Sequence, residues 1–133
     1  MKIDLPKIAE YFRISAVRDW KTARGLFQIK RYDACLFFCH LTLEKSLKYL
    51  VTLKIKDFPP YSHKLLKLAQ TAGLSLTKEQ KISLKEINTF NISGRYENSK
   101  LSFYKECNAE YTKNYLDITQ NLLLWLQKNY PKK

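Results

Sequence analysis

The chain has 133 residues, which is enough for one domain and too few for two. Apolar residues make up 45% of it, and only three glycines and four prolines occur, which argues against wholesale disorder and against an all-β fold. The net charge of +12 is spread as +7 over residues 1–66 and +5 over residues 67–133, which excludes a basic tail. This charge indicates either a lysine-rich solvated surface or a binding surface for an acidic partner, meaning RNA, a nucleotide or an acidic protein.

Apolar side chains at helical spacing predict a first helix that ends near Lys30. The opposite side of this helix carries the basic residues Lys7, Arg18 and Lys21, so the helix is amphipathic. The apolar stripe consists of Ile8, Phe12, Ala16, Trp20, Ala23 and Phe27.

Residues 32–56 are the most apolar segment and predict a second helix that is apolar on nearly all sides. Such a helix lies in the middle of a bundle or supports an oligomer interface. Its polar side chains Asp33, His40, Glu44 and Lys48 project within an arc of about 80°. A Pro-Pro pair follows and cannot continue the helix.

Two shorter helices are expected next. Ser62 is a plausible N-cap for the third helix, with Gly73 at its C-terminal end. Thr77 and Gln80 match a capping box, which opens a fourth helix that reaches about Phe90.

The remaining chain is predicted to contain one irregular segment and one long helix. Residues 91–107 lack helical periodicity, and Asn108 then caps a last helix that Pro131 stops. We therefore expect an all-α, antiparallel up-and-down bundle of about five helices, three long and two short, in one domain over residues 1–133.

The cysteines favour a reducing environment. Their number is odd, and Cys35 and Cys39 lie one helical turn apart, which is typical of small buried hydrophobic residues. Cys39 and His40 are adjacent and point about 100° apart, and no fourth ligand has recognisable spacing, so we expect no metal site and no cofactor. The N-terminus has no apolar signal region, and the chain has no run of ~18 apolar residues, so a cytoplasmic location is expected.

Few residues can support catalysis. The glycine-rich phosphate-binding loops and the nucleophile elbow G-x-S-x-G are absent from the sequence. His40 is either a satisfied core or interface histidine or a catalytic one. His63, near the start of the third helix, either packs across its loop or takes part in chemistry.

Several short runs resemble the HEPN family (higher eukaryotes and prokaryotes nucleotide-binding domain) in their order along the chain. The runs are residues 18–23 (RDWKTA), 32–38 (YDACLFF), 43–48 (LEKSLK), 62–68 (SHKLLKL) and 94–96 (GRY). The resemblance covers roughly residues 12–128, and it implies a helical bundle that usually dimerises. It also implies a cytosolic protein that is often paired with a minimal nucleotidyltransferase in a toxin–antitoxin system.

Many members of the wider superfamily are metal-independent ribonucleases that carry an Arg, four to six further residues and then a His. Arg95 has no such histidine after it. Without that imidazole, the 2′-hydroxyl of RNA lacks an obvious general base. The departure counts against ribonuclease activity and leaves the fold unaffected.

The polar arc of the second helix is expected to form a cleft with Arg95 and His63. Glu44 and Lys48 form either a simple i,i+4 pair, contributing ~0.3–0.5 kcal/mol, or part of a groove that recognises a nucleotide or a partner's side chains. Arg95 either clamps a phosphate, with Tyr96 beside it, or only holds its loop onto the bundle. The candidate nucleotide-, RNA- or partner-binding residues are Arg95, Tyr96, His63, His40, Glu44 and Lys48.

Three functions are consistent with these features. The leading hypothesis is a non-catalytic interaction module that partners a minimal nucleotidyltransferase, and it predicts a protein that is not an enzyme. The alternatives are a metal-independent endoribonuclease without the usual histidine, and a plain RNA-binding protein. The apolar second helix predicts a homodimer or a tight complex with the partner.

Overall fold

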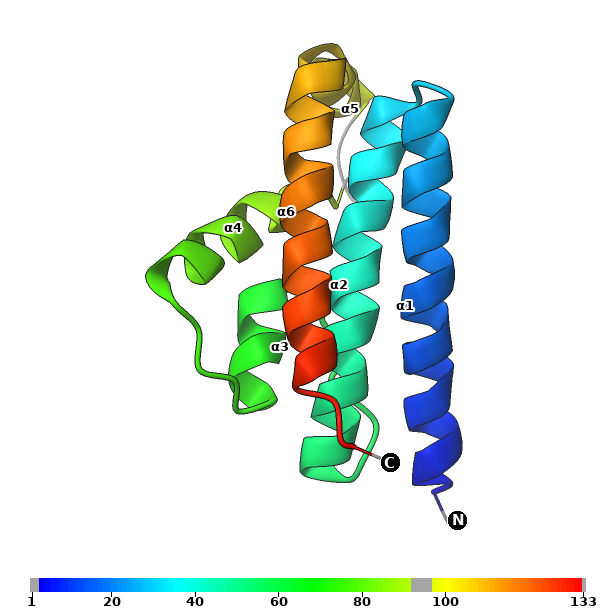
Figure 1. Cartoon of the computed structure of the whole chain (residues 1–133), viewed down its shortest axis with the longest axis vertical. Coiled ribbons are helices and arrows are strands. Elements are labelled where there is room, and N and C mark those ends of the chain that lie inside the picture. Colours follow the sequence, from blue (N-terminus) through cyan, green and yellow to red (C-terminus); the bar gives the residue numbers. More distant parts are fainter. Residues whose placement is uncertain (1–2, 92–96, 133) are drawn as a thin grey trace.

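The computed structural model of the chain describes residues 3–91 and 97–132, and its regular elements there are all helices. This confirms the all-α bundle. In Figure 1 the three long helices lie side by side, with two short helices along one flank and a third at one end. The helices are α1 (Leu5–Gln28), α2 (Tyr32–Ile55), α3 (Leu65–Thr71), α4 (Lys78–Asn88), α5 (Glu97–Glu106) and α6 (Ala109–Lys128).

The direction of the long helices explains why the chain needs the short ones. Helices α1 and α2 are antiparallel, whereas α6 runs in the same direction as α2 (Figure 1). The segment between α2 and α6 therefore has to carry the chain back to the end of the bundle where α2 began. The up-and-down order thus holds for the first pair of helices, and the return path consists of α3, α4 and α5.

The described residues form six helices, one more than the expected five. Helix α5 lies within residues 91–107, which were expected to be irregular. Its side chains show little helical periodicity, and Phe103 and Cys107 are the residues of this region that reach the core. Tertiary packing of these two side chains outweighs the weak local pattern.

Two of the three predicted helix caps are confirmed. Thr77 and Gln80 form the expected capping box at α4, and Asn108 Oδ1 accepts a hydrogen bond from the Tyr111 amide at 2.8 Å. The prediction that Ser62 caps α3 is wrong. The N-cap is Lys64, and the amide of Leu65 donates at 2.8 Å to the side chain of Asn88 in α4.

Small side chains allow α1 to pack closely on α2. Ala9, Ala16 and Ala23 are the buried residues of α1 and recur every seven residues, so they lie along one line of the helix. The larger members of the predicted stripe are only partly buried on either side of this line. On one side, the Lys45 ammonium of α2 donates to Ser15 Oγ at 2.7 Å and pairs with Asp19 at 3.3 Å.

Helix α2 is the centre of the bundle, as its composition predicts. It packs against α1, α3 and α6, and most of its side chains are buried. The C-terminal segment is fixed to α2 by Tyr130, whose hydroxyl hydrogen-bonds Ser46 at 2.6 Å and whose ring lies 4.5 Å from that of Tyr49. The three cysteines are buried, as their small apolar character predicts.

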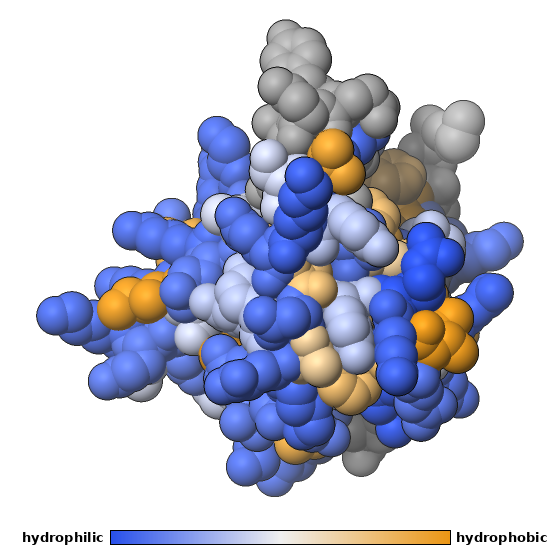
Figure 2. Space-filling view, turned by 90° about the horizontal axis from the view of Figure 1, so that it is seen from above, coloured by the Kyte–Doolittle hydropathy of each residue, from blue (hydrophilic) through white to orange (hydrophobic). Residues whose placement is uncertain are grey.

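The surface is mainly polar at the end of the bundle that Figure 2 shows, with hydrophobic residues scattered singly. Isolated apolar residues of this kind are normal on a protein surface. Among the described residues, none of the helices combines the length and the apolar character required to span a lipid bilayer.

Gly25 lies in the interior of α1 without any local need for a glycine. A Cβ atom built there would meet nothing within 4 Å, and the residue is exposed. Because glycine costs roughly 0.5–1 kcal/mol relative to alanine inside a helix, we expect Gly25→Ala to stabilise the protein by about that amount. Urea unfolding followed by circular dichroism measures the change. Gly73→Ala is the opposite control, since its φ of 76° is strained for alanine.

Candidate functional site

A buried carboxylate forms the centre of the polar cluster on α2. The Glu44 side chain is 3% exposed. Its Oε1 accepts a hydrogen bond from His63 Nδ1 at 2.9 Å, and its Oε2 accepts one from the Lys48 ammonium at 3.0 Å. Burying a carboxylate is costly unless it is paired and hydrogen-bonded, and here both oxygens have a donor.

His40 binds the backbone of the loop between α2 and α3, which carries His63. It is fully buried, and its Nε2 lies 3.1 Å from the carbonyl oxygen of His63, so this nitrogen is the donor. Its Nδ1 is 3.8 Å from Glu44 Oε1 and has no hydrogen-bond partner in the described part of the chain. Burial lowers the pKa of His40, outweighing the opposite effects of the His63 carbonyl and the Glu44 carboxylate. The imidazole is therefore held in its neutral form.

The outer edge of the cluster is open to solvent. The His63 side chain is 45% exposed, and its ring meets the ring of Tyr61 edge-on at 5.5 Å. Tyr61 is 94% exposed, and the Lys48 ammonium lies 5.9 Å from the centre of its ring. Such an edge offers an aromatic face, an imidazole and a partly shielded cation, which are groups that can contact a base and a phosphate.

The Glu44–His63 pair also has the geometry of an acid–base dyad. A carboxylate that accepts from one ring nitrogen of a histidine fixes its tautomer and leaves the other nitrogen as a proton acceptor. In this chain the oriented ring is half exposed, so a substrate proton can reach it. The arrangement can therefore either hold the loop on α2 or perform proton transfer.

The structure brings together four of the residues that the sequence singled out, namely His40, Glu44, Lys48 and His63. Glu44 and Lys48 form the i,i+4 pair that the sequence suggests, but both side chains are buried and Glu44 also binds His63 of the loop. Arg95 and Tyr96 lie outside the described residues.

Asp33 does not join the cluster. It precedes His40 by seven residues, which is about 10 Å along a helix axis. Its Oδ1 is buried and has no hydrogen-bond partner within residues 3–91 and 97–132.

Tyr61 is the member of the cluster that was not predicted from the sequence. Its position two residues before His63, directly after the Pro-Pro pair, was the available signal.

No group of three or more His, Cys, Asp or Glu side chains suited to a metal ion occurs among the described residues.

Comparison with protein families matches residues 9–130 to the HEPN domain. Among solved structures, the fold is similar to the crystal structure of TT1696 from Thermus thermophilus, with a TM-score of 0.76 and 18% sequence identity. The similar region covers 92% of this chain and 98% of that one, and at this identity it supports the fold alone. No curated protein matches the chain significantly.

Glu44→Ala should destabilise the protein strongly, because it leaves Lys48 buried without a counter-charge and releases His63. Breaking a buried pair in this way costs about 3–5 kcal/mol. The matched control is Asp117→Ala, which removes the exposed i,i+4 partner of Lys113 on α6 and should cost less than about 0.5 kcal/mol. Chemical denaturation measures both, and equal effects would contradict the structural role of Glu44.

Stability should fall as the solution is acidified below about pH 6.5, the ordinary pKa of an unfolded histidine. The folded state keeps His40 neutral because burial lowers its pKa, so the unfolded chain binds more protons in this range. The stabilisation is complete above pH 6.5 and is lost as the pH falls toward the lowered pKa of the folded state.

Melting temperatures between pH 7.5 and 5 measure this dependence. The fall should persist in His63→Gln, which leaves His40 in place, and should become smaller in His40→Gln. An unchanged fall in His40→Gln would assign the effect to other groups.

Proposed function

The chain belongs to the HEPN family, and we propose on this basis that it is a non-catalytic interaction module in the cytoplasm. Its partner would be a minimal nucleotidyltransferase, in a toxin–antitoxin-like pair in which this chain presents a nucleotide or substrate. The observation that supports a binding role most directly is the use of both histidines in holding the loop between α2 and α3.

The departure from the ribonuclease signature supports the same proposal. The residues that follow Arg95 at the required spacing include no histidine. His40 is buried, and His63 is the remaining imidazole of the chain, committed on one side to Glu44. The usual pair of histidines, one acting as general acid and the other as general base, is therefore not available.

The open edge of the polar cluster is the proposed nucleotide-contacting surface. The exposed ring of Tyr61 offers a stacking face, and Lys48 and the exposed part of His63 offer charge and hydrogen-bond donors beside it. Arg95 and Tyr96 are proposed to complete this surface.

Assembly through α2 is part of the proposal. Phe37, Phe38 and Leu41 of this central helix remain only partly buried within the chain. The rings of the two phenylalanines meet edge-on at 5.8 Å. Apolar side chains of this size on an otherwise buried helix favour a homodimer or a tight complex with the partner.

A metal-independent endoribonuclease is the second candidate, and the Glu44–His63 dyad is the observation that favours it. In such a reaction His63 would take the proton of the 2′-hydroxyl, whose oxygen would attack the adjacent phosphate. The bond from phosphorus to the 5′-oxygen would break, and water would protonate the departing oxygen. Lys48 and Arg95 would stabilise the added negative charge.

Coexpression with a nucleotidyltransferase encoded in a neighbouring reading frame tests the leading proposal. We expect the two proteins to copurify, and light scattering should give the mass of a complex that contains a dimer of this chain. A clean monomer at high micromolar concentration, with no complex, would contradict the proposal.

Incubation of the purified chain with a structured RNA in EDTA distinguishes the second candidate. We expect no cleavage by the wild type, His63→Gln or Arg95→Ala, and only a modest, salt-sensitive loss of any RNA binding in Arg95→Ala. Cleavage by the wild type that His63→Gln abolishes would instead establish an enzyme.

A further inference from the structure

Two hollows follow one side of α1 and meet at Tyr11. The first, of about 620 Å³, lies beside the start of α1 and is lined mainly by Ile3, Ile8, Phe12 and Phe58. The second, of about 450 Å³, continues past Tyr11 and is bounded by α1 and by Phe38 of α2. We call them together the α1 groove. It extends from the first turn of α1 to Thr22, which is roughly 25 Å along a helix axis.

Large apolar side chains line this groove without being covered. Tyr11 is 61% exposed, Phe58 59%, Ile14 45% and Ile3 40%. Scattered single residues of this kind would need no explanation, but these four line two neighbouring hollows that share Tyr11. The groove is therefore a candidate docking surface, which adjoins the half-buried face of α2 at Phe38.

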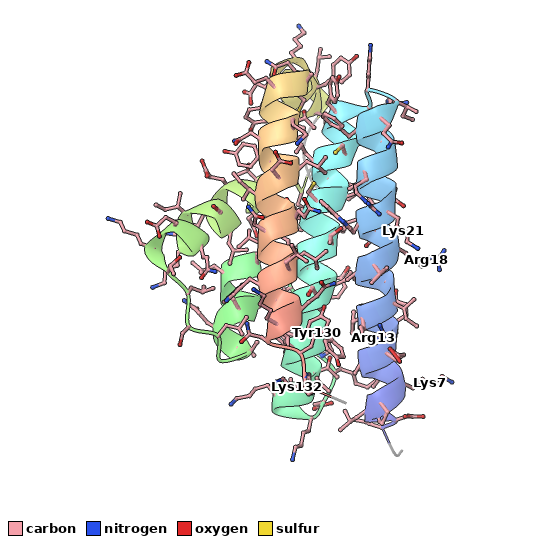
Figure 3. All side chains as sticks on the ribbon, in the orientation of Figure 1. Lys7, Arg13, Arg18, Lys21, Tyr130 and Lys132 are labelled. Atoms are coloured by element: carbon pink, nitrogen blue, oxygen red, sulfur yellow. The ribbon has the colours of Figure 1, made fainter. Side chains whose placement is uncertain are left out.

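Basic side chains form its outer rim. Lys7 and Arg18 line the groove, and Lys21 follows one turn later on the same exposed side of α1. Figure 3 shows all three on the side of α1 that faces away from the bundle. No carboxylate among the described residues forms an ion pair with any of them.

The carboxylates of the groove are already engaged. Asp4 caps α1 by accepting from the Lys7 amide at 3.2 Å, and Asp19 pairs with Lys45 at 3.3 Å. The charge that remains available to a partner is therefore positive. Its position beside an apolar floor matches the usual anatomy of a protein interface, which has an apolar centre and a polar rim.

We propose that the α1 groove binds an amphipathic helix of an acidic partner protein, a step that rests on the proposed role as an interaction module. The apolar face of such a helix would lie on Tyr11 and Phe58, and its Asp and Glu residues would face Lys7 and Arg18.

Charge and solvation favour this occupant over two others. The half of the groove near Phe58 is almost wholly apolar and has Lys7 as its one basic lining residue, so the phosphates of an RNA would lose water there and gain few donors. A second copy of the chain would bring the same Lys7 and Arg18 to the contact, so like charges would meet across this groove.

The test uses two synthetic 21-residue helical peptides with the same leucine face, one with glutamates and the other with lysines on the remaining positions. Fluorescence anisotropy should show binding of the acidic peptide, weakened by salt, and little binding of the basic one. Lys7→Glu combined with Arg18→Glu should weaken the acidic peptide at least about tenfold and improve the basic one. Tyr11→Ala should weaken the acidic peptide without reversing the charge preference.

The control is Lys81→Glu, an exposed charge reversal on α4, which should leave the acidic peptide unaffected. Equal affinity for both peptides, or no effect of the groove variants, would overturn the proposal. Displacement of the acidic peptide by a 20-nucleotide RNA, with the same dependence on Lys7 and Arg18, would reassign the groove to nucleic acid. Self-association that Arg18→Glu alters would reassign it to a second copy.

Failure of this inference and failure of the proposed function give different results. If the nucleotidyltransferase complex forms equally well with the groove variants, the module proposal holds and the groove proposal fails. If the acidic peptide binds while the nucleotidyltransferase does not, the groove proposal holds and the partner assignment fails.

Discussion

A polar side chain removed from water is costly unless it is paired, and three consecutive polar residues of the central helix each pair with a different part of the bundle. In the run that resembles the HEPN pattern, consecutive residues of α2 point to different neighbours. Glu44 holds the loop before α3, Lys45 holds α1, and Ser46 holds the C-terminal segment through Tyr130. One turn of helix therefore fastens three separate parts of the chain, because an unpaired polar group at these positions would be costly.

Most of the fold could be predicted from the sequence because its signals are local. The periodicity of the long helices and the capping box at Thr77 depend only on neighbouring residues. Helix α5 was missed because its formation depends on the burial of Phe103, and no local sequence pattern predicts that burial. The Ser62 cap was wrong for a related reason, since the donor at Leu65 is satisfied by Asn88 from another helix. A single sequence does not reveal the contacts between residues that are far apart along the chain.

The candidate site shows the same division. Helical geometry alone places His40, Glu44 and Lys48 on one side of α2, so this part of the site could be predicted from the sequence. The approach of His63 to Glu44 depends on how the loop after α2 folds back, so it could only be guessed from the resemblance. The burial of Lys48 is equally non-local, and it changes a marginal surface pair into a structural contact whose loss is costly.

The short connection between the first two helices has a consequence during synthesis of the protein. Helices α1 and α2 are linked by residues 29–31, so their close packing needs nothing from the rest of the chain. This hairpin can form while the ribosome is still translating, yet the face of α2 that later meets α6 stays uncovered until the end. At ~5–20 residues per second, residues 56–128, which end with α6, take roughly 4–15 s to emerge. For that interval the nascent chain exposes its most apolar helix, which makes it a natural client for chaperones.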